Sequence, residues 1–228
     1  MMLIFEATVL LSFVTLITAI PEPVPAIKIE NGIPRAPAPL LAGPNGASNP
    51  SFNGKSLTAS EGTFWIGKPT GTSCSLPDHS KCPKGTDTAV NVWLAGTVNM
   101  SVAVAGGQQV YIGPNGALSY TKAGAPPNSM PKYSITRGFC WVKDSKGTVT
   151  LESRMADGSW LACPVDQNSV ATGPWKVYKD RTYMKGSDRH YVVQDTNVPS
   201  GKKSDCVSFN IIGTPGTISV GAAAYEYT

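Results

Sequence analysis

Short apolar segments that alternate with polar residues follow one another along most of the chain after residue 60. In residues 89–95, for example, Val90, Val92 and Leu94 occupy alternate positions. A period of two places such side chains on one face of a β-strand. Glycine, proline, asparagine and aspartate separate these segments, and these residues favour turns.

The segments are numerous and closely spaced, which predicts an all-β fold. The alternation of strands with helices that a parallel sheet requires is missing from the pattern. We therefore expect an antiparallel β-sandwich or barrel-like domain built from hairpins. The predicted strands cover residues 62–67, 89–95, 99–104, 108–113, 117–121, 135–142, 148–154, 159–163, 175–179, 190–195, 205–212 and 218–227.

The glycine-rich stretch AGGQQVYIGPNGALSYT could be a phosphate-binding loop or a hairpin. Pro114 presets φ for a turn and Asn115 tolerates a left-handed backbone, so a hairpin is favoured. A phosphate-binding loop needs G-x-x-x-x-G-K-[ST] before a helix, which this stretch does not contain. We expect the apolar residues of the two arms to pair, Val110 and Ile112 with Leu118 and Tyr120.

The start of the chain differs in composition from the rest. Residues 1–19 contain an apolar run and end in Ala19, as in a secretory signal. Glu6 and the absence of Lys or Arg there are unusual for a signal, and a buried N-terminal helix is the alternative. Residues 20–50 are dense in proline and predict a leader or spacer. Residues 51–228 form the expected single domain, with no membrane anchor.

The charge of the chain is mildly positive. The formal net charge is +4, and it becomes +5 (19 basic minus 14 acidic residues) when Glu6 leaves with the signal. Residues 174–191 interleave lysines and arginines with aromatic residues, which is a composition that can bind nucleic acid. Asp180 and Asp188 dilute this charge, so we prefer a strand pair with one solvated face and expect no nucleic-acid partner.

Disulfide bonds are the default state of cysteines in a secreted chain. Two bridges among five cysteines allow fifteen arrangements. We expect one bridge within CSLPDHSKC and another between the strand-like ends SWLAC and SDCVSF, leaving the cysteine of RGFCWV as a buried free thiol. The expected pairs are Cys74–Cys82 and Cys163–Cys206, and the free thiol is Cys140.

Other candidate sites are sparse. A zinc site at Cys74, His79 and Cys82 would lack a second ligand pair, so we expect no metal. Asn99-Met100-Ser101 is the N-x-[ST] sequon without proline and predicts an exposed N-glycan on Asn99.

Catalytic motifs are missing from the sequence. It contains neither G-x-S-x-G nor H-E-x-x-H. His79 and His190 are the two histidines, and each is more simply a surface residue than a general base. We expect no catalytic residues and no cofactor, and no pair of carboxylates is singled out for glycoside hydrolysis.

Five stretches stand out within residues 52–228, namely GTFWIG, SCSLPDHSKCPKGTDTAV, GGQQVYIGPNGALSYT, LACPV and VPSGKKSDCVSF. In this order they resemble stretches of the fungal cell-wall protein PhiA family and its allergenic relatives. The resemblance implies a secreted, wall-associated protein linked to phialide and conidium development, and it supplies no catalytic residues. Four cysteines match the family pattern and Cys140 does not. The proline-rich leader and residues 174–190 also depart from that pattern.

The sequence is compatible with three functions. The first is a non-enzymatic structural or interaction protein of the cell wall. The second is a carbohydrate-binding protein or effector, because exposed aromatic rings contact sugar rings, and the third and least favoured is a glycoside hydrolase. Most tryptophans lie in apolar segments and are expected in the core. Trp175, Lys176 and Tyr178 are the candidate contacts with wall glucan, chitin or mannan.

Overall fold

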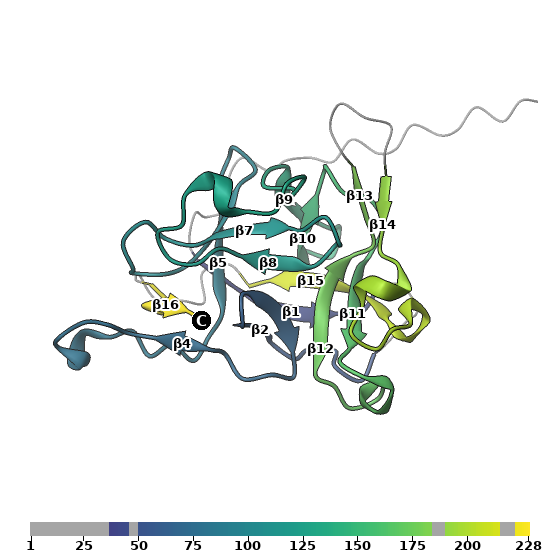
Figure 1. Cartoon of the computed structure of the whole chain (residues 1–228), viewed down its shortest axis with the longest axis horizontal. Coiled ribbons are helices and arrows are strands. Elements are labelled where there is room, and N and C mark those ends of the chain that lie inside the picture. Colours follow the sequence, from purple (N-terminus) through teal and green to yellow (C-terminus); the bar gives the residue numbers. More distant parts are fainter. Residues whose placement is uncertain (1–36, 46–49, 184–189, 215–221) are drawn as a thin grey trace, which may run out of the picture.

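The computed structural model describes residues 37–45, 50–183, 190–214 and 222–228 (Figure 1). In these residues the structure consists of β-strands and short 3₁₀-helices, which confirms the predicted all-β class. None of the helices in the described ranges is long and apolar enough to cross a membrane. The predicted signal lies outside the described residues.

Each predicted strand segment overlaps an observed strand, although residues 218–221 of the last segment lie outside the described residues. Four further strands are β1, β2, β4 and β13. The strands are β1 (Ala38–Gly43), β2 (Leu57–Ser60), β3 (Thr63–Ile66), β4 (Thr72–Ser73), β5 (Ala89–Val92), β6 (Val98–Met100), β7 (Gln109–Ile112), β8 (Leu118–Tyr120), β9 (Phe139–Lys143), β10 (Val149–Ser153), β11 (Trp160–Pro164), β12 (Trp175–Lys179), β13 (Arg181–Tyr183), β14 (His190–Val192), β15 (Val207–Gly213) and β16 (Glu226–Tyr227). The 3₁₀-helices are η1 (His79–Lys81), η2 (Pro127–Ser129), η3 (Gln167–Ser169), η4 (Asp195–Asn197) and η5 (Lys203–Asp205).

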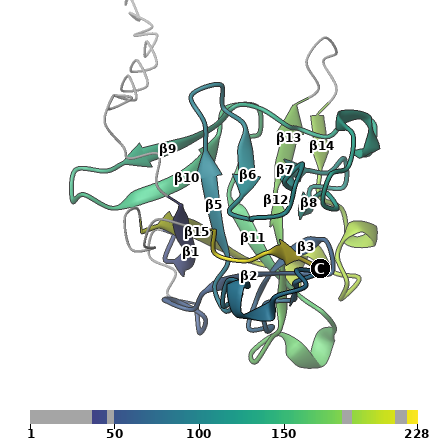
Figure 2. The same ribbon diagram turned by 90° about the vertical axis from the view of Figure 1, so that its left-hand side faces the viewer.

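The main sheet closes on itself as a barrel-like ring. Its strands follow the order β1-β5-β6-β7-β8-β3-β12-β11-β15, and β15 also pairs with β1. All of these pairings are antiparallel, and Figures 1 and 2 show the strands wrapped around a common interior. Closure removes the exposed edges that an open sheet would present to other chains. The expected barrel-like arrangement is therefore present.

Strand β1 corrects one part of the expectation that residues 20–50 form a leader or spacer, because residues 38–43 belong to the folded domain, whereas residues 20–36 and 46–49 lie outside the described residues. Its first residues pair with β5 and its remaining residues pair with β15. Ala38, Leu40 and Ala42 are each 1% exposed. Because β1 supplies the pairing that closes the ring, the folded domain begins before residue 51. The high proline content of residues 20–50 had argued against a strand there. Pro39 lies at the position where β1 changes its pairing from β5 to β15.

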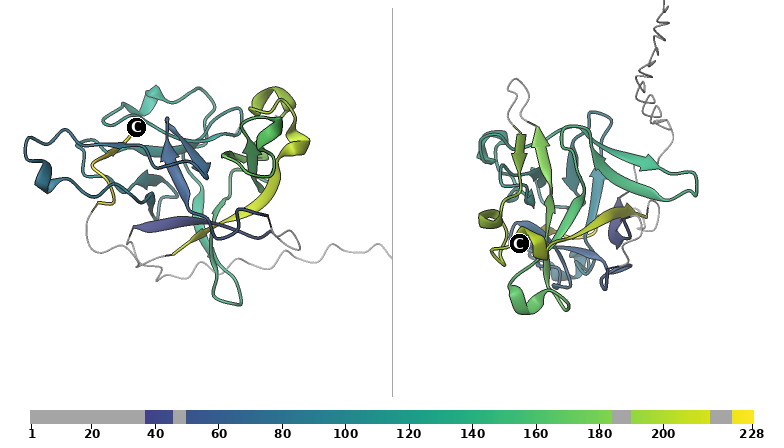
Figure 3. Two further views of the ribbon diagram at one scale, coloured as in Figure 1. Left: turned by 90° about the horizontal axis from the view of Figure 1, so that it is seen from below. Right: turned by 90° about the vertical axis from the view of Figure 1, so that its right-hand side faces the viewer.

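Strand β15 pairs with three other strands, β11, β1 and β10. Its first residues pair with β11, and Ile212 pairs with both Leu41 of β1 and Thr150 of β10. The β9–β10 hairpin therefore branches from the ring and projects from it (Figures 2 and 3). Inside the ring lies a continuous apolar core that includes Phe64, Trp160 and Phe209.

The glycine-rich stretch is a hairpin, as predicted. Val110 pairs with Tyr120, and Ile112 pairs with Leu118. The amide of Gly116 donates to the carbonyl of Gly113 at 2.9 Å. Gly116 has φ +85°, a left-handed value that glycine adopts without steric cost. The glycines of this stretch therefore shape turns.

Candidate functional site

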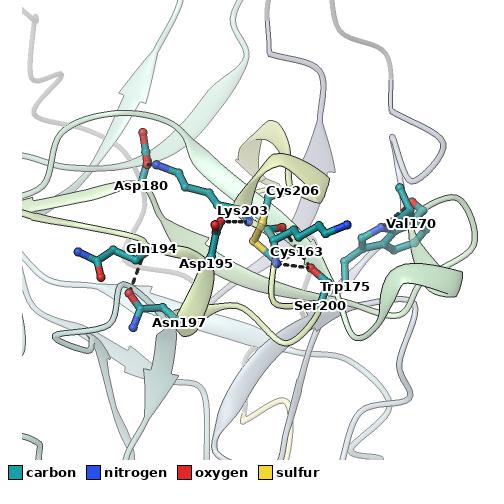
Figure 4. The surroundings of a disulfide bond; sticks show 11 residues. Cys163, Val170, Trp175, Asp180, Gln194, Asp195, Asn197, Ser200, Lys203 and Cys206 are labelled. Atoms are coloured by element: carbon teal, nitrogen blue, oxygen red, sulfur yellow. Dashed lines mark hydrogen bonds and ion pairs between the residues drawn. A yellow bond between two sulfur atoms is a disulfide. The ribbon is translucent and has the colours of Figure 1, made fainter.

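Strand β12 overturns the expectation that Trp175 and Tyr178 are exposed. The strand lies in the ring between β11 and β3, and the two side chains are 1% and 2% exposed. The Trp175 indole packs 4.9 Å from the ring of Phe52 and donates Nε1–H to the carbonyl of Val170 at 3.2 Å (Figure 4). Neither ring can stack on a sugar in this fold.

Lysines of the same strand are also less solvated than the sequence predicted. Lys179 is 2% exposed, lies 4.7 Å from the Trp160 ring centroid, and places Nζ 3.4 Å from the carboxylate of Glu152. Lys176 Nζ lies 5.7 Å from the ring centroid of Trp65. Burial lowers the pKa of both lysines. Lys176 and Lys179 therefore pack against tryptophan rings and do not form a fully solvated charged face.

The second disulfide ties the segment before β15 to β11. Cys163 bonds to Cys206, and Cys163 is fully buried. Nearby, Lys203 forms an ion pair with Asp180 at 2.5 Å, and its backbone amide donates to Asp195 at 2.7 Å (Figure 4). These bonds anchor the long connection that covers the outer side of β11 and β12.

The other predicted pairing is present as well. Cys74 bonds to Cys82 across the loop that holds η1. Both sulfur atoms are thereby used, so Cys74, His79 and Cys82 cannot form the zinc site that was weighed as an alternative. Cys140 is a free thiol, as expected, but it is half-buried rather than buried.

The β2–β3 turn positions an exposed carboxylate. Glu61 and Gly62 have φ of +56° and +72°, the values of a two-residue type I′ hairpin. Asparagine and glycine favour these positions, whereas another residue in the left-handed region costs about 1 kcal/mol. The Glu61 carboxylate lies 2.7 Å from Nζ of Lys68, which in turn lies 4.5 Å from the Trp65 ring centroid.

Beside this turn lies a pocket of about 580 Å³. Its lining comes from the β2–β3 turn, from the open end of the β7–β8 hairpin, where β7 begins and β8 ends, and from β16, which lies near β7 and β8 in Figure 1. The rim carries the charged side chains of Glu61, Lys122 and Glu226. Glu226 accepts a hydrogen bond from Ser73 at 3.1 Å. Polar side chains held by neighbours in this way offer preformed partners to a hydroxyl-rich ligand.

The floor of the pocket is fixed by buried hydrogen bonds. Gln108 is 2% exposed, and its amide both donates to and accepts from the backbone of Tyr227, at 2.8 and 2.7 Å. The Tyr120 hydroxyl accepts from the amide of Gly62 and donates to the carbonyl of Thr228. Because buried polar groups with satisfied bonds rigidify a site, the pocket keeps its shape without a ligand.

Alkaline pH should destabilise the protein through its buried tyrosines. Burial raises the pKa of Tyr120 and of Tyr178 from 10.0 to about 12. Each raised pKa contributes stability that is complete below pH 10 and is lost as pH rises toward 12. Burial lowers the pKa of Lys179, so that group acts in the opposite sense. Urea unfolding of the wild type and Tyr178→Phe between pH 9 and about 12 measures the effect, and we expect a shallower loss in the variant. Equal slopes would contradict the role of Tyr178.

Two features of the surface escaped the sequence patterns. Trp93, expected in the core, is 47% exposed, and Leu94 beside it is 87% exposed. The pocket also unites residues far apart in the sequence, so no local motif marks it.

Asn99, the predicted glycan acceptor, is half-buried on β6. His79 is exposed on η1, and His190 lies on β14.

Comparisons with known proteins relate the chain to secreted proteins. No solved structure matches the chain. A protein of Arthroderma benhamiae, described as an uncharacterized secreted protein, is 27% identical over 179 residues, which cover 75% of this chain and 77% of that protein. The model of the PhiA-like secreted protein family matches residues 47–228. The chain therefore belongs to the PhiA-like secreted protein family.

Proposed function

We propose that this protein is a non-enzymatic interaction protein of the fungal cell wall that holds wall polysaccharide in the pocket beside the β2–β3 turn. Membership of a secreted family supports its export. A role in conidiation or phialide development is part of the proposal and rests on the family resemblance. Glucan, chitin and mannan are the candidate ligands, because each offers hydroxyl groups to the charged rim.

The left-handed backbone of Glu61 is the observation that carries the proposal. Stability alone favours Asn or Gly at φ +56°, yet the chain places a carboxylate there. Residues held in sparsely populated backbone regions cluster at binding sites, where the geometry serves the ligand. Glu61 lines the pocket, and the ion pair with Lys68 restricts where its carboxylate can lie. A carboxylate accepts hydrogen bonds from two neighbouring hydroxyls of a sugar.

Glu61→Asn separates binding from folding. Asparagine suits the turn, so the melting temperature should stay level or rise, whereas loss of a charged acceptor should weaken polysaccharide binding by about tenfold or more. Co-sedimentation with insoluble β-glucan, chitin and mannan measures the binding. The protein is expected to sediment with one of these polymers.

Asp78→Asn is the matched control, because Asp78 is also a lysine-paired carboxylate in an exposed turn, here with Lys81 at 3.5 Å. It should leave sedimentation unchanged. Equal binding by wild type and Glu61→Asn would refute the pocket as the contact. Fractionation of cultures into medium, detergent-extractable wall and alkali-extractable wall tests the location independently.

The proposed lack of turnover has its own measurement. Incubation of the purified protein with the same polymers should release no reducing sugar beyond the level of a heat-inactivated sample. Steady release that one Asp or Glu substitution abolishes would make the protein a glycoside hydrolase instead.

A further inference from the structure

The turn between β5 and β6 fixes the backbone of Trp93 and leaves its indole partly in solvent. The Trp93 amide donates to the carbonyl of Thr97, and the Gly96 amide donates to the carbonyl of Trp93, both within 2.9 Å. Gly96 has φ +75° and lies so close to Gly138 that an added Cβ would come within 2.8 Å of that backbone. The turn is thus locked against the neighbouring segment while Trp93 stays 47% exposed.

Strand register puts Trp93 on the same face as the glycosylation sequon. Asn91 pairs with Asn99, and the bond between Trp93 and Thr97 makes these two the next outward-facing pair along the hairpin. Val98 and Met100 point into the core on either side of Asn99. Trp93 and Asn99 are therefore diagonal neighbours, a separation that aromatic and long side chains span.

We propose that the N-glycan of Asn99 folds back on this face, with its first N-acetylglucosamine ring stacked on the indole of Trp93. The C–H groups of a pyranose ring are weakly positive and the face of an indole is negative, so the two surfaces attract each other and exclude water. The contact accounts for a large apolar side chain that the barrel leaves half in solvent. It is independent of the pocket beside Glu61 and extends beyond the proposed function.

Attachment of the glycan follows the ordinary chemistry of the sequon. The Asn99 amide nitrogen forms a bond to C1 of a lipid-linked oligosaccharide and loses one proton, while the bond from C1 to the lipid diphosphate breaks and that diphosphate leaves. Ser101, the sequon hydroxyl, is 3% exposed and accepts from the amide of Ala223 in the fold. Modification must therefore precede folding of this segment.

Graded removal of the glycan tests the contact on the protein secreted from a fungal host. Trimming to one N-acetylglucosamine should leave the melting temperature unchanged, whereas complete removal should lower it by about 2–4 °C. Because complete enzymatic removal leaves aspartate, Asn99→Asp is the reference for that product. In Trp93→Ala, complete removal should cause no further fall.

Leu94→Ala is the matched control, since it removes an apolar side chain from the same turn and should keep the effect of the glycan. In NMR spectra, protons of the first sugar should move upfield in the wild type and return to ordinary positions in Trp93→Ala. An unmodified Asn99 in the secreted protein overturns the proposal. An equal fall in melting temperature on complete glycan removal in wild type and Trp93→Ala also overturns it. Loss of wall-polysaccharide binding in Trp93→Ala with Asn99 unmodified overturns it as well.

Discussion

Replacing Cys163 and Cys206 together by alanine should lower the melting temperature of the protein by about 10 °C. The bridge spans 43 residues, and closing a loop of that length removes about 4 kcal/mol of chain entropy from the unfolded state. In a domain of this size each kcal/mol corresponds to about 2–4 °C. Cys163 is fully buried, so its loss also loosens the covering segment against β11.

Calorimetry on this variant and on Cys74→Ala with Cys82→Ala measures the difference. The Cys74–Cys82 bridge closes only 8 residues in an exposed loop, for which the same relation gives about 2.5 kcal/mol. We expect the smaller fall there. A larger fall in the Cys74–Cys82 variant would contradict the importance of the long loop.

The intact mass of the secreted wild type should be lower than that of the reduced chain by the mass of four hydrogens.

Gly116→Val should destabilise the protein by about 3 kcal/mol. Its φ of +85° disfavours any side chain by about 1 kcal/mol. A Cβ at this position would also lie 2.8 Å from the carbonyl oxygen of Lys179 and 2.5 Å from a methyl group of Val193. Overpacking of this kind costs a further ~1–3 kcal/mol. Denaturant unfolding at constant slope measures the change.

Gly147→Val is the control for backbone strain alone. Gly147 has nearly the same φ, +88°, but an added Cβ would have nothing within 4 Å. We expect a loss of about 1 kcal/mol there. Equal losses at the two glycines would mean that the contact with Lys179 and Val193 does not limit the space at Gly116.

Local patterns predicted those parts of the fold that depend on neighbouring residues. Alternation and turn residues located the β7–β8 hairpin and its register, because a two-residue period and a proline-asparagine turn are properties of a few adjacent positions. The two disulfides were also predicted. The site beside Glu61 was not, because it joins turns and strands that are distant in sequence.

By itself the sequence determined the all-β class and most of the strand segments, since these follow from short-range periodicity. The expected Cys74–Cys82 pair followed from closeness in sequence, whereas the structure was needed to show that Cys163 and Cys206 meet across 43 residues. Only the tertiary structure decided which strands are central. Trp175 is buried because it packs in the core of the ring against Phe52, whereas Trp93 is exposed because its hairpin ends at the surface. It also decided that a proline-rich segment becomes β1, because only the pairing of β1 with both β5 and β15 closes the barrel and buries Leu40.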